Sequence, residues 1–142
     1  MNATIALQHV GLARAVISAE DIATYERDGA VIIRDAVSAD WIDAMRSAVD
    51  EVLRSPTAFA SENTPPGEAG RFYGDTFVWL SQPRFAQFIL ESPLAELAGR
   101  IMRAERVNFF YDQLLVKEPG TASRTPWHQD LPYWPVRGWQ IA

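Results

Sequence analysis

Residues 106–117 constrain the fold of this chain more than any other segment. They are dense in aromatic and branched side chains, with polar residues between them, which is the pattern of a β-strand. Because alternate side chains of a strand point to opposite faces, one face should carry Phe109, Tyr111, Gln113, Leu115 and Lys117. A strand needs partners for its backbone hydrogen bonds, so this segment predicts a sheet late in the chain.

Most of the sequence before this segment has helical patterns. Helices are predicted over residues 19–28, 38–55, 83–90 and 93–103. The first follows Ser18, a favourable N-cap with an aspartate three positions later, and stops at Gly29. The second opens at Ser38, has apolar residues at helical spacing and should end before Pro56. The helices therefore precede most of the β-structure.

Three shorter segments favour extended structure. Residues 30–34 read as a buried strand, and residues 71–80 as an extended segment after a polar loop over 55–70. Residues 138–142 look like the start of another strand, which would have few partners. We therefore expect an α+β fold in one domain, residues 1–142, with 1–17 as a flexible N-terminus. An incomplete sheet also predicts that the chain is a fragment whose unpaired edge favours self-association.

Composition excludes several classes of function. The net charge is −5 and the pI is about 5.0, so no global basic field attracts nucleic acid or an anionic membrane surface. The chain has no cysteine, which excludes disulfides and thiolate metal sites. No secretory signal or membrane-length apolar run is evident. A cytoplasmic protein with a small-molecule partner is the expectation.

His128 and Asp130 form the clearest candidate site. On an extended backbone, residues two positions apart project to the same face, so the imidazole and the carboxylate can converge on one metal ion. A histidine and a carboxylate are two of the three protein ligands in the facial triad of non-haem Fe(II) oxygenases. The third ligand should be a histidine, but the only other one in the sequence is His9.

Three stretches resemble the phytanoyl-CoA dioxygenase-like Fe(II)/2-oxoglutarate oxygenases. They are Tyr-Glu-Arg-Asp-Gly-Ala-Val-Ile-Ile at 25–33, Asp-Gln-Leu-Leu-Val-Lys at 112–117 with the Pro-Gly loop after it, and Pro-Trp-His-Gln-Asp-Leu-Pro-Tyr-Trp at 126–134. The third is the most specific. The resemblance implies a double-stranded β-helix, a jelly-roll barrel flanked by N-terminal helices, and it covers only the N-terminal half of that domain.

The resemblance also implies a ligand set. His128 and Asp130 would be the first two Fe(II) ligands, and the cosubstrate 2-oxoglutarate would lie near Gln113, Gln129 and Arg71. The distal histidine of the family, and the arginine beyond it, have no counterparts here. His9 lies in the N-terminal preamble and is not expected to fill the gap. Because halogenating relatives replace the carboxylate of Asp130 by a small residue, the resemblance favours hydroxylation of a small organic substrate.

Each candidate residue also has a plainer interpretation. His128 and Gln113 could be hydrogen-bonded side chains without a ligand, and Arg71 a structural or solvent-facing charge. Lys117 reads as a solvated charge at the end of a strand. The aromatic residues could line a substrate pocket or simply fill the core, and these are Trp127, Tyr133, Trp134 and Trp139. The alternative function is a non-catalytic module that binds a small molecule or a partner at an exposed sheet edge.

Overall fold

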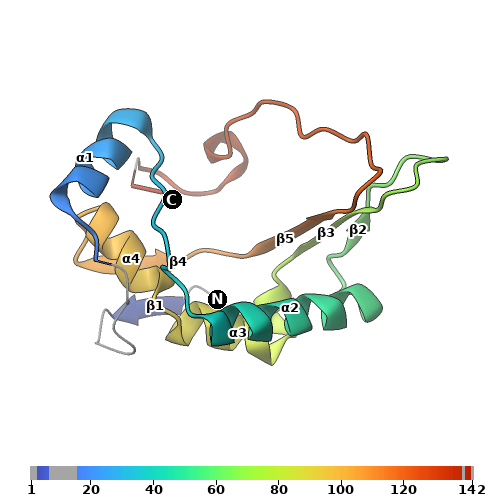
Figure 1. Ribbon diagram of the computed structural model, residues 1–142, viewed down its shortest axis with the longest axis horizontal. Helices are drawn as coiled ribbons and strands as arrows, with labels where there is room; N and C mark the ends of the chain where they lie inside the picture. Colours follow the sequence, from blue (N-terminus) through green and yellow to red (C-terminus); the bar gives the residue numbers. More distant parts are fainter. Residues whose placement is uncertain (1–2, 7–15, 139, 142) are drawn as a thin grey trace.

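The computed structural model describes residues 3–6, 16–138 and 140–141, and it shows a mixed α+β arrangement (Figure 1). The helices are α1 (Ala19–Asp28), α2 (Ala39–Arg54), α3 (Pro83–Glu91) and α4 (Leu94–Ile101). The strands are β1 (Ala3–Ala6), β2 (Ser61–Glu62), β3 (Phe72–Thr76), β4 (Arg106–Phe109) and β5 (Gln113–Lys117). Short 3-10 turns are η1 (Val78–Leu80) and η2 (Leu131–Tyr133). No helix among the described residues is long and apolar enough to cross a membrane.

The helices begin and end where their local signals predict. Ser18 Oγ accepts a hydrogen bond from the backbone N–H of Asp21, whose carboxylate accepts one from the Ser18 N–H. The Ser18 hydroxyl also donates to the Asp21 carboxylate, and this bond, followed by the one from the Ser18 N–H, lowers the pKa of Asp21. Gly29 ends α1 in the left-handed conformation, with φ of 73°. Ser38 caps α2 in a similar way. The prediction of these helices is confirmed.

The three-stranded sheet has the antiparallel order β2-β3-β5, and within the described residues helices cover one of its faces. Its covered face packs on α2 and α3 through one core cluster, Ala48, Val52, Tyr73, Val78 and Phe85. The other face presents Phe72, Gly74 and Thr76 of β3, which lie opposite Lys117, Leu115 and Gln113 of β5. We call this uncovered side the open face. It carries Gln113, one of the candidate cosubstrate residues.

A second, smaller sheet pairs β1 with β4. Beside it, Ile17 packs against Leu97 and Ile101 of α4, with Val31 and Ile33 at the edge of this cluster. Residues 3–6 thus form a strand within the segment predicted to be flexible, whereas residues 1–2 and 7–15 lie outside the described residues.

Several strand predictions are wrong or only partly right. The extended segment predicted over 71–80 ends at Thr76, and Val78–Leu80 form η1 instead. Residues 30–34 form no strand, because no described segment pairs with them, although Val31 and Ile33 alternate inward. Residues 106–117 are not one strand but two, β4 and β5, which belong to different sheets. Just before β5, the Asp112 carbonyl accepts from Phe77 N–H in register with β3, and its carboxylate accepts from Trp79 N–H in η1 at 3.1 Å. Burial raises the pKa of Asp112.

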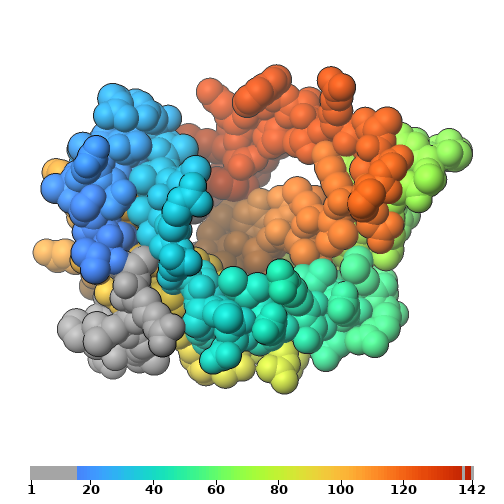
Figure 2. Space-filling model, in the orientation of Figure 1, coloured from blue at the N-terminus to red at the C-terminus, as the bar shows by residue number. Residues whose placement is uncertain are grey.

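After β5 the chain turns back across the open face (Figure 1). We call residues 118–134 the arm. The arm carries His128 and contains no strand, and Figure 2 shows a hollow between it and the rest of the molecule. Gly138, Gln140 and Ile141 also form no strand, so the predicted strand over 138–142 is absent from its described residues. The described strands do not close into a jelly roll.

Candidate metal and cosubstrate site

His128 and Asp130 converge, although not through an extended strand. Nε2 of His128 lies 3.0 Å from Oδ1 of Asp130, and both side chains are about half exposed. The backbone is irregular up to Gln129 and takes the right-handed helical conformation at Asp130, where η2 begins. The predicted pair is therefore formed by the turn that enters η2.

The other nitrogen of the imidazole is held by the backbone. Nδ1 of His128 lies 2.7 Å from the carbonyl oxygen of Pro126, and a carbonyl oxygen can only accept, so Nδ1 carries the proton of this bond. This bond, followed by the charge of Asp130, raises the pKa of His128. In the neutral imidazole the lone pair is on Nε2 and faces the carboxylate. Metal-binding histidines are commonly held in this tautomer by an acceptor that bonds the other ring N–H.

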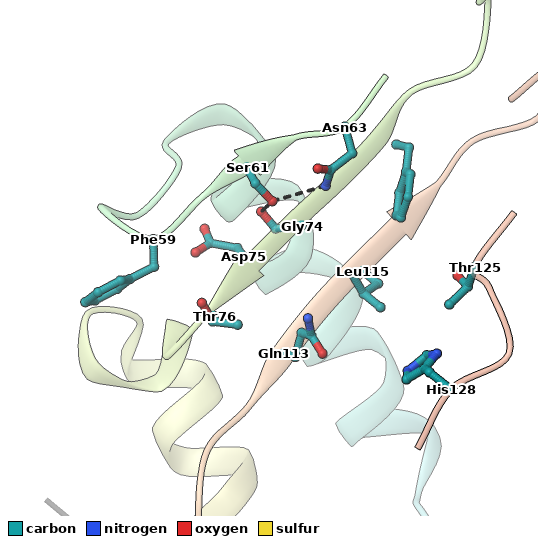
Figure 3. A pocket seen from close by; sticks show the side chains of 11 residues that line it. Phe59, Ser61, Asn63, Gly74, Asp75, Thr76, Gln113, Leu115, Thr125 and His128 are labelled. Atoms are coloured by element: carbon teal, nitrogen blue, oxygen red, sulfur yellow. Dashed lines mark hydrogen bonds between the residues drawn. The ribbon is translucent and has the colours of Figure 1, made fainter. Parts of the chain in front are cut away.

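A cleft of about 290 Å³ lies between the open face and the arm. Gln113, Leu115 and Gly74 form part of its floor, and Thr125 and His128 of the arm line it from the opposite side (Figure 3). Its remaining lining mixes aromatic and small polar residues, namely Phe59, Ser61, Asn63, Phe72, Asp75 and Thr76. The cleft is therefore both apolar and able to hydrogen-bond, as small-molecule sites are.

The fold thus brings Gln113 and His128 to one cleft, which the other two cosubstrate candidates do not line. Arg71 does not line the cleft: its Nε lies 2.7 Å from the carboxylate of Glu62, and its guanidinium covers the ring of Tyr73. Gln129 lies in the arm between the two candidate ligands, but it does not line the cleft either. Cosubstrate contact by these residues stays a prediction.

The described part of the chain contains no group of three or more histidine, cysteine, aspartate or glutamate residues placed to hold a metal ion. His128 and Asp130 are thus a pair without a third protein ligand within the described ranges. The residue His9 falls in the stretch 7–15, which lies outside them.

The aromatic residues of the motif behave differently from one another. Trp127 and Tyr133 are largely exposed, and neither lines the cleft. Trp134 packs edge-on against Phe110 and Tyr111, and its indole N–H donates to the Tyr111 hydroxyl at 3.0 Å. Trp134 therefore anchors the end of the arm. Trp139 lies outside the described residues.

Sequence reasoning overlooked the residues that hold the arm in place. Lys117 is not merely solvated, because its ammonium group donates to the arm at two points. Glu68, in the loop between β2 and β3, accepts two hydrogen bonds from the arm. The signal available was weak: Lys117 is the only lysine in the sequence, and it stands at the junction of β5 and the arm.

The sequence of this chain is similar to those of known proteins. Two relatives are named ectoine dioxygenase: that of Sphingopyxis alaskensis is 27% identical over 124 residues, covering 86% of this chain and 40% of the relative. That of Bordetella parapertussis is 25% identical over 123 residues, covering 84% and 39%. The chain therefore spans about two fifths of the length of these relatives. No solved structure matches it.

The sequence profile of the phytanoyl-CoA dioxygenase (PhyH) family matches residues 25–141. That range includes the last residues of α1, the whole of α2, α3 and α4, the three strands of the larger sheet and the whole arm. It also includes His128, Asp130 and the cleft between them and Gln113. The chain belongs to the phytanoyl-CoA dioxygenase family.

Proposed function

We propose that His128 and Asp130 supply two ligands to an Fe(II) ion in a 2-oxoglutarate-dependent hydroxylation of a small organic substrate. One observation carries the proposal. With Nδ1 protonated toward Pro126, the Nε2 lone pair and Asp130 Oδ1 are two acceptors only 3.0 Å apart. Two such acceptors need a cation between them, either a proton or a metal ion.

The separation of these two atoms fits a metal ion. Two ligands at about 2.1 Å from a divalent ion, at adjacent octahedral positions, lie about 3.0 Å apart. Neutral imidazole and carboxylate are also two of the ligand types of the facial triad. The pair lacks a third protein ligand among the described residues, so complete binding requires one from elsewhere. The residues present therefore fit part of the family's metal site.

The chain's own residues would orient the metal ligand and the cosubstrate and would exclude water from the cleft. Pro126 fixes the imidazole so that Nε2 faces the ion, and Gln113 offers an amide to a cosubstrate in the cleft. Leu115 and Phe59 present apolar surface that excludes water from the same space. The bound iron and 2-oxoglutarate would supply the oxidising chemistry. In this proposal Asp130 is the carboxylate that halogenating relatives replace by a small residue, and its presence supports hydroxylation.

The class of substrate follows from the cleft. A volume of about 290 Å³, with hydrogen-bonding groups beside apolar ones, suits a small organic molecule. The two ectoine dioxygenase relatives support a small polar compound of this size as the substrate class. Their low identity does not extend to a particular substrate.

The test is an anaerobic titration of Fe(II) into the purified chain with 2-oxoglutarate, followed by the weak visible absorption of the chelate. We expect a saturable signal that His128→Ala and Asp130→Asn reduce, because each removes a ligand. His9→Ala is the matched control and should leave the signal unchanged. A wild-type signal equal to that of His128→Ala, from folded protein, would refute the metal site in this chain.

A second candidate is a binding module without catalysis. The observation that favours it is the absence of a third ligand within the described ranges. It predicts that 2-oxoglutarate or another small molecule binds in the cleft equally well with and without Fe(II). Isothermal titration with and without the metal separates the two candidates.

A further inference from the structure

The arm crosses the open face without forming any strand, so its position depends on side-chain contacts. Lys117 extends from the last position of β5 and covers the ring of Phe72, with its Nζ 4.5 Å from the ring centre. From there Nζ donates to the carbonyl of Ser123 at 3.1 Å and to the hydroxyl of Thr125 at 2.8 Å. One ammonium group thus joins the sheet to two points of the arm.

A second set of contacts holds the beginning of the arm. The carboxylate of Glu68 accepts from the hydroxyl of Thr121 at 2.6 Å and from the N–H of Ala122 at 3.0 Å, across more than fifty residues of sequence. Beside it, Gly70 lies so close to the arm that an added Cβ would stand 2.2 Å from the backbone nitrogen of Thr121. Lys117, Glu68 and Gly70 together are called the clasp.

The contacts of Lys117 lie next to the cleft. Thr125, which receives a hydrogen bond from Lys117, lines the cleft itself and stands three positions before His128. Between them Pro126 accepts the imidazole proton of His128. The path from ammonium to imidazole is therefore short: Lys117, Thr125, Pro126, His128. Hydrogen bonds that involve a charged group are stronger than neutral ones, so Lys117 is the firmest single tether on this path.

We propose that Lys117 is a positioning residue, which holds the arm so that His128 faces the open sheet at Gln113 and Leu115. The inference rests on the proposed function for its consequence, metal binding, but not for the clasp itself. Lys117 touches neither candidate ligand. Groups that orient metal ligands typically change metal affinity about 10- to 100-fold when removed. We expect the lower end, because Lys117 acts through two intervening residues.

The experiment compares Lys117→Met, Lys117→Arg and Arg124→Met in the full chain. Arg124→Met is the matched control, because it also removes a cation from the arm. The Arg124 side chain makes no ion pair within the part of the chain that the structure describes. Hydrogen exchange of residues 121–128 without metal measures the clasp. The affinity for Co²⁺, obtained from the visible absorption of the bound ion, reports on the proposed metal site. Exchange of α2 and β3 confirms that the variants are folded.

For Lys117→Met we expect exchange of residues 121–128 to rise about tenfold, the scale set by losing hydrogen bonds to a charged group. Co²⁺ affinity should fall about tenfold. Arginine at position 117 can still donate to both acceptors and should recover much of each loss. The control should match wild type.

The outcomes separate the two proposals. Unchanged exchange in Lys117→Met would overturn the clasp, whatever the metal does. Faster exchange with unchanged Co²⁺ affinity would overturn the positioning role. If wild type binds no Co²⁺ while the exchange still rises, the clasp stands and the metal site of the proposed function falls.

Because Lys117 is the only lysine, its ammonium group can be observed alone. In protein labelled with ¹⁵Nζ-lysine, we expect one side-chain signal with nuclear Overhauser contacts to the Thr125 methyl group and the Phe72 ring. A freely rotating signal without these contacts would contradict the proposal independently of any substitution.

Discussion

The two faces of the β2-β3-β5 sheet are held in different ways. The covered face is a packed core, in which Tyr73 is 1% exposed and Asp75 is 2% exposed. The open face is crossed by the arm, which is held by the clasp and by Trp134. On the covered face, the close packing of buried apolar side chains holds the helices against the sheet. The open face depends on a few polar contacts, each of which contributes little by itself.

The covered face nevertheless contains a polar network, which is fully satisfied. Asp75 accepts hydrogen bonds from the hydroxyls of Tyr73 and Thr57 and from the Thr57 N–H. Burial, and then the hydrogen bond to Asp75, raise the pKa of Tyr73, so its hydroxyl stays a donor. A buried carboxylate with several donors rigidifies a core, whereas loss of one donor is costly. The difference between the faces therefore lies in burial, not in polarity.

The largest expected effect comes from breaking the covered face. Tyr73→Ala should lower the free energy of unfolding by about 3–5 kcal/mol, because it leaves a cavity and removes a donor from Asp75. Tyr73→Phe keeps the ring and should cost about 1 kcal/mol. Urea denaturation measures both. An alanine variant as stable as the phenylalanine variant would mean that the core is not centred on this ring.

The junction of the two faces comes next. Gly70→Ala should cost about 1–3 kcal/mol, because the new Cβ meets backbone atoms of the arm that cannot rotate away. The same substitution should speed hydrogen exchange in residues 121–128. Gly67→Ala is the control: it stands at φ of 86° with no neighbour within 4 Å, so it should cost about 1 kcal/mol of backbone strain and leave the arm unchanged. Equal exchange in the two variants would contradict the close approach.

A smaller effect is expected at the far end of the arm. Trp134→Phe retains an aromatic ring beside Phe110 but removes the hydrogen bond to the Tyr111 hydroxyl, which should cost about 1 kcal/mol. Trp127→Phe changes a fully exposed side chain and should leave stability unchanged. Both are measured by denaturant unfolding. If the two variants lose the same stability, Trp134 is not an anchor.

The smallest effect concerns the protonation of His128 in the arm. His128 has its pKa raised above the ordinary value of 6.5, first by the Pro126 carbonyl and then by Asp130. A raised pKa means that protonation favours the folded arm below pH 6.5, and that this contribution disappears as the pH rises through the folded pKa. Asp130→Asn should lower the pKa of His128 but leave it above 6.5, because the carbonyl remains. Imidazole NMR against pH checks this, and an unchanged pKa in the variant would show that the two side chains do not interact in solution.

Self-association is still a prediction. β5 has β3 on one side and no other described strand on the other, so part of its backbone is available for pairing. We expect sedimentation that depends on protein concentration. A single monomeric species at all concentrations would contradict this expectation.

Local signals in the sequence determined the helices and the motif. Ser18 with Asp21, Gly29 and Ser38 act over a few residues, so they fix α1 and α2 independently of the rest of the fold. His128 and Asp130 are likewise only two positions apart, which made them recognisable as a pair. The family resemblance rests on the same contiguous stretches, and the family profile confirms it.

Tertiary structure decided what depends on partners distant in sequence. Residues 30–34 look like a strand but have no described segment to pair with, and Asp112 divides 106–117 because it caps η1, more than thirty residues earlier. Arg71 pairs with Glu62, nine residues away in the sequence, and its contact with the cosubstrate stays a prediction. The clasp needs Glu68 to contact Thr121 of the arm, 53 residues later in the sequence. Helix caps and short motifs are set by local geometry, whereas strand pairing and the placement of the arm require contacts that exist only in the folded chain.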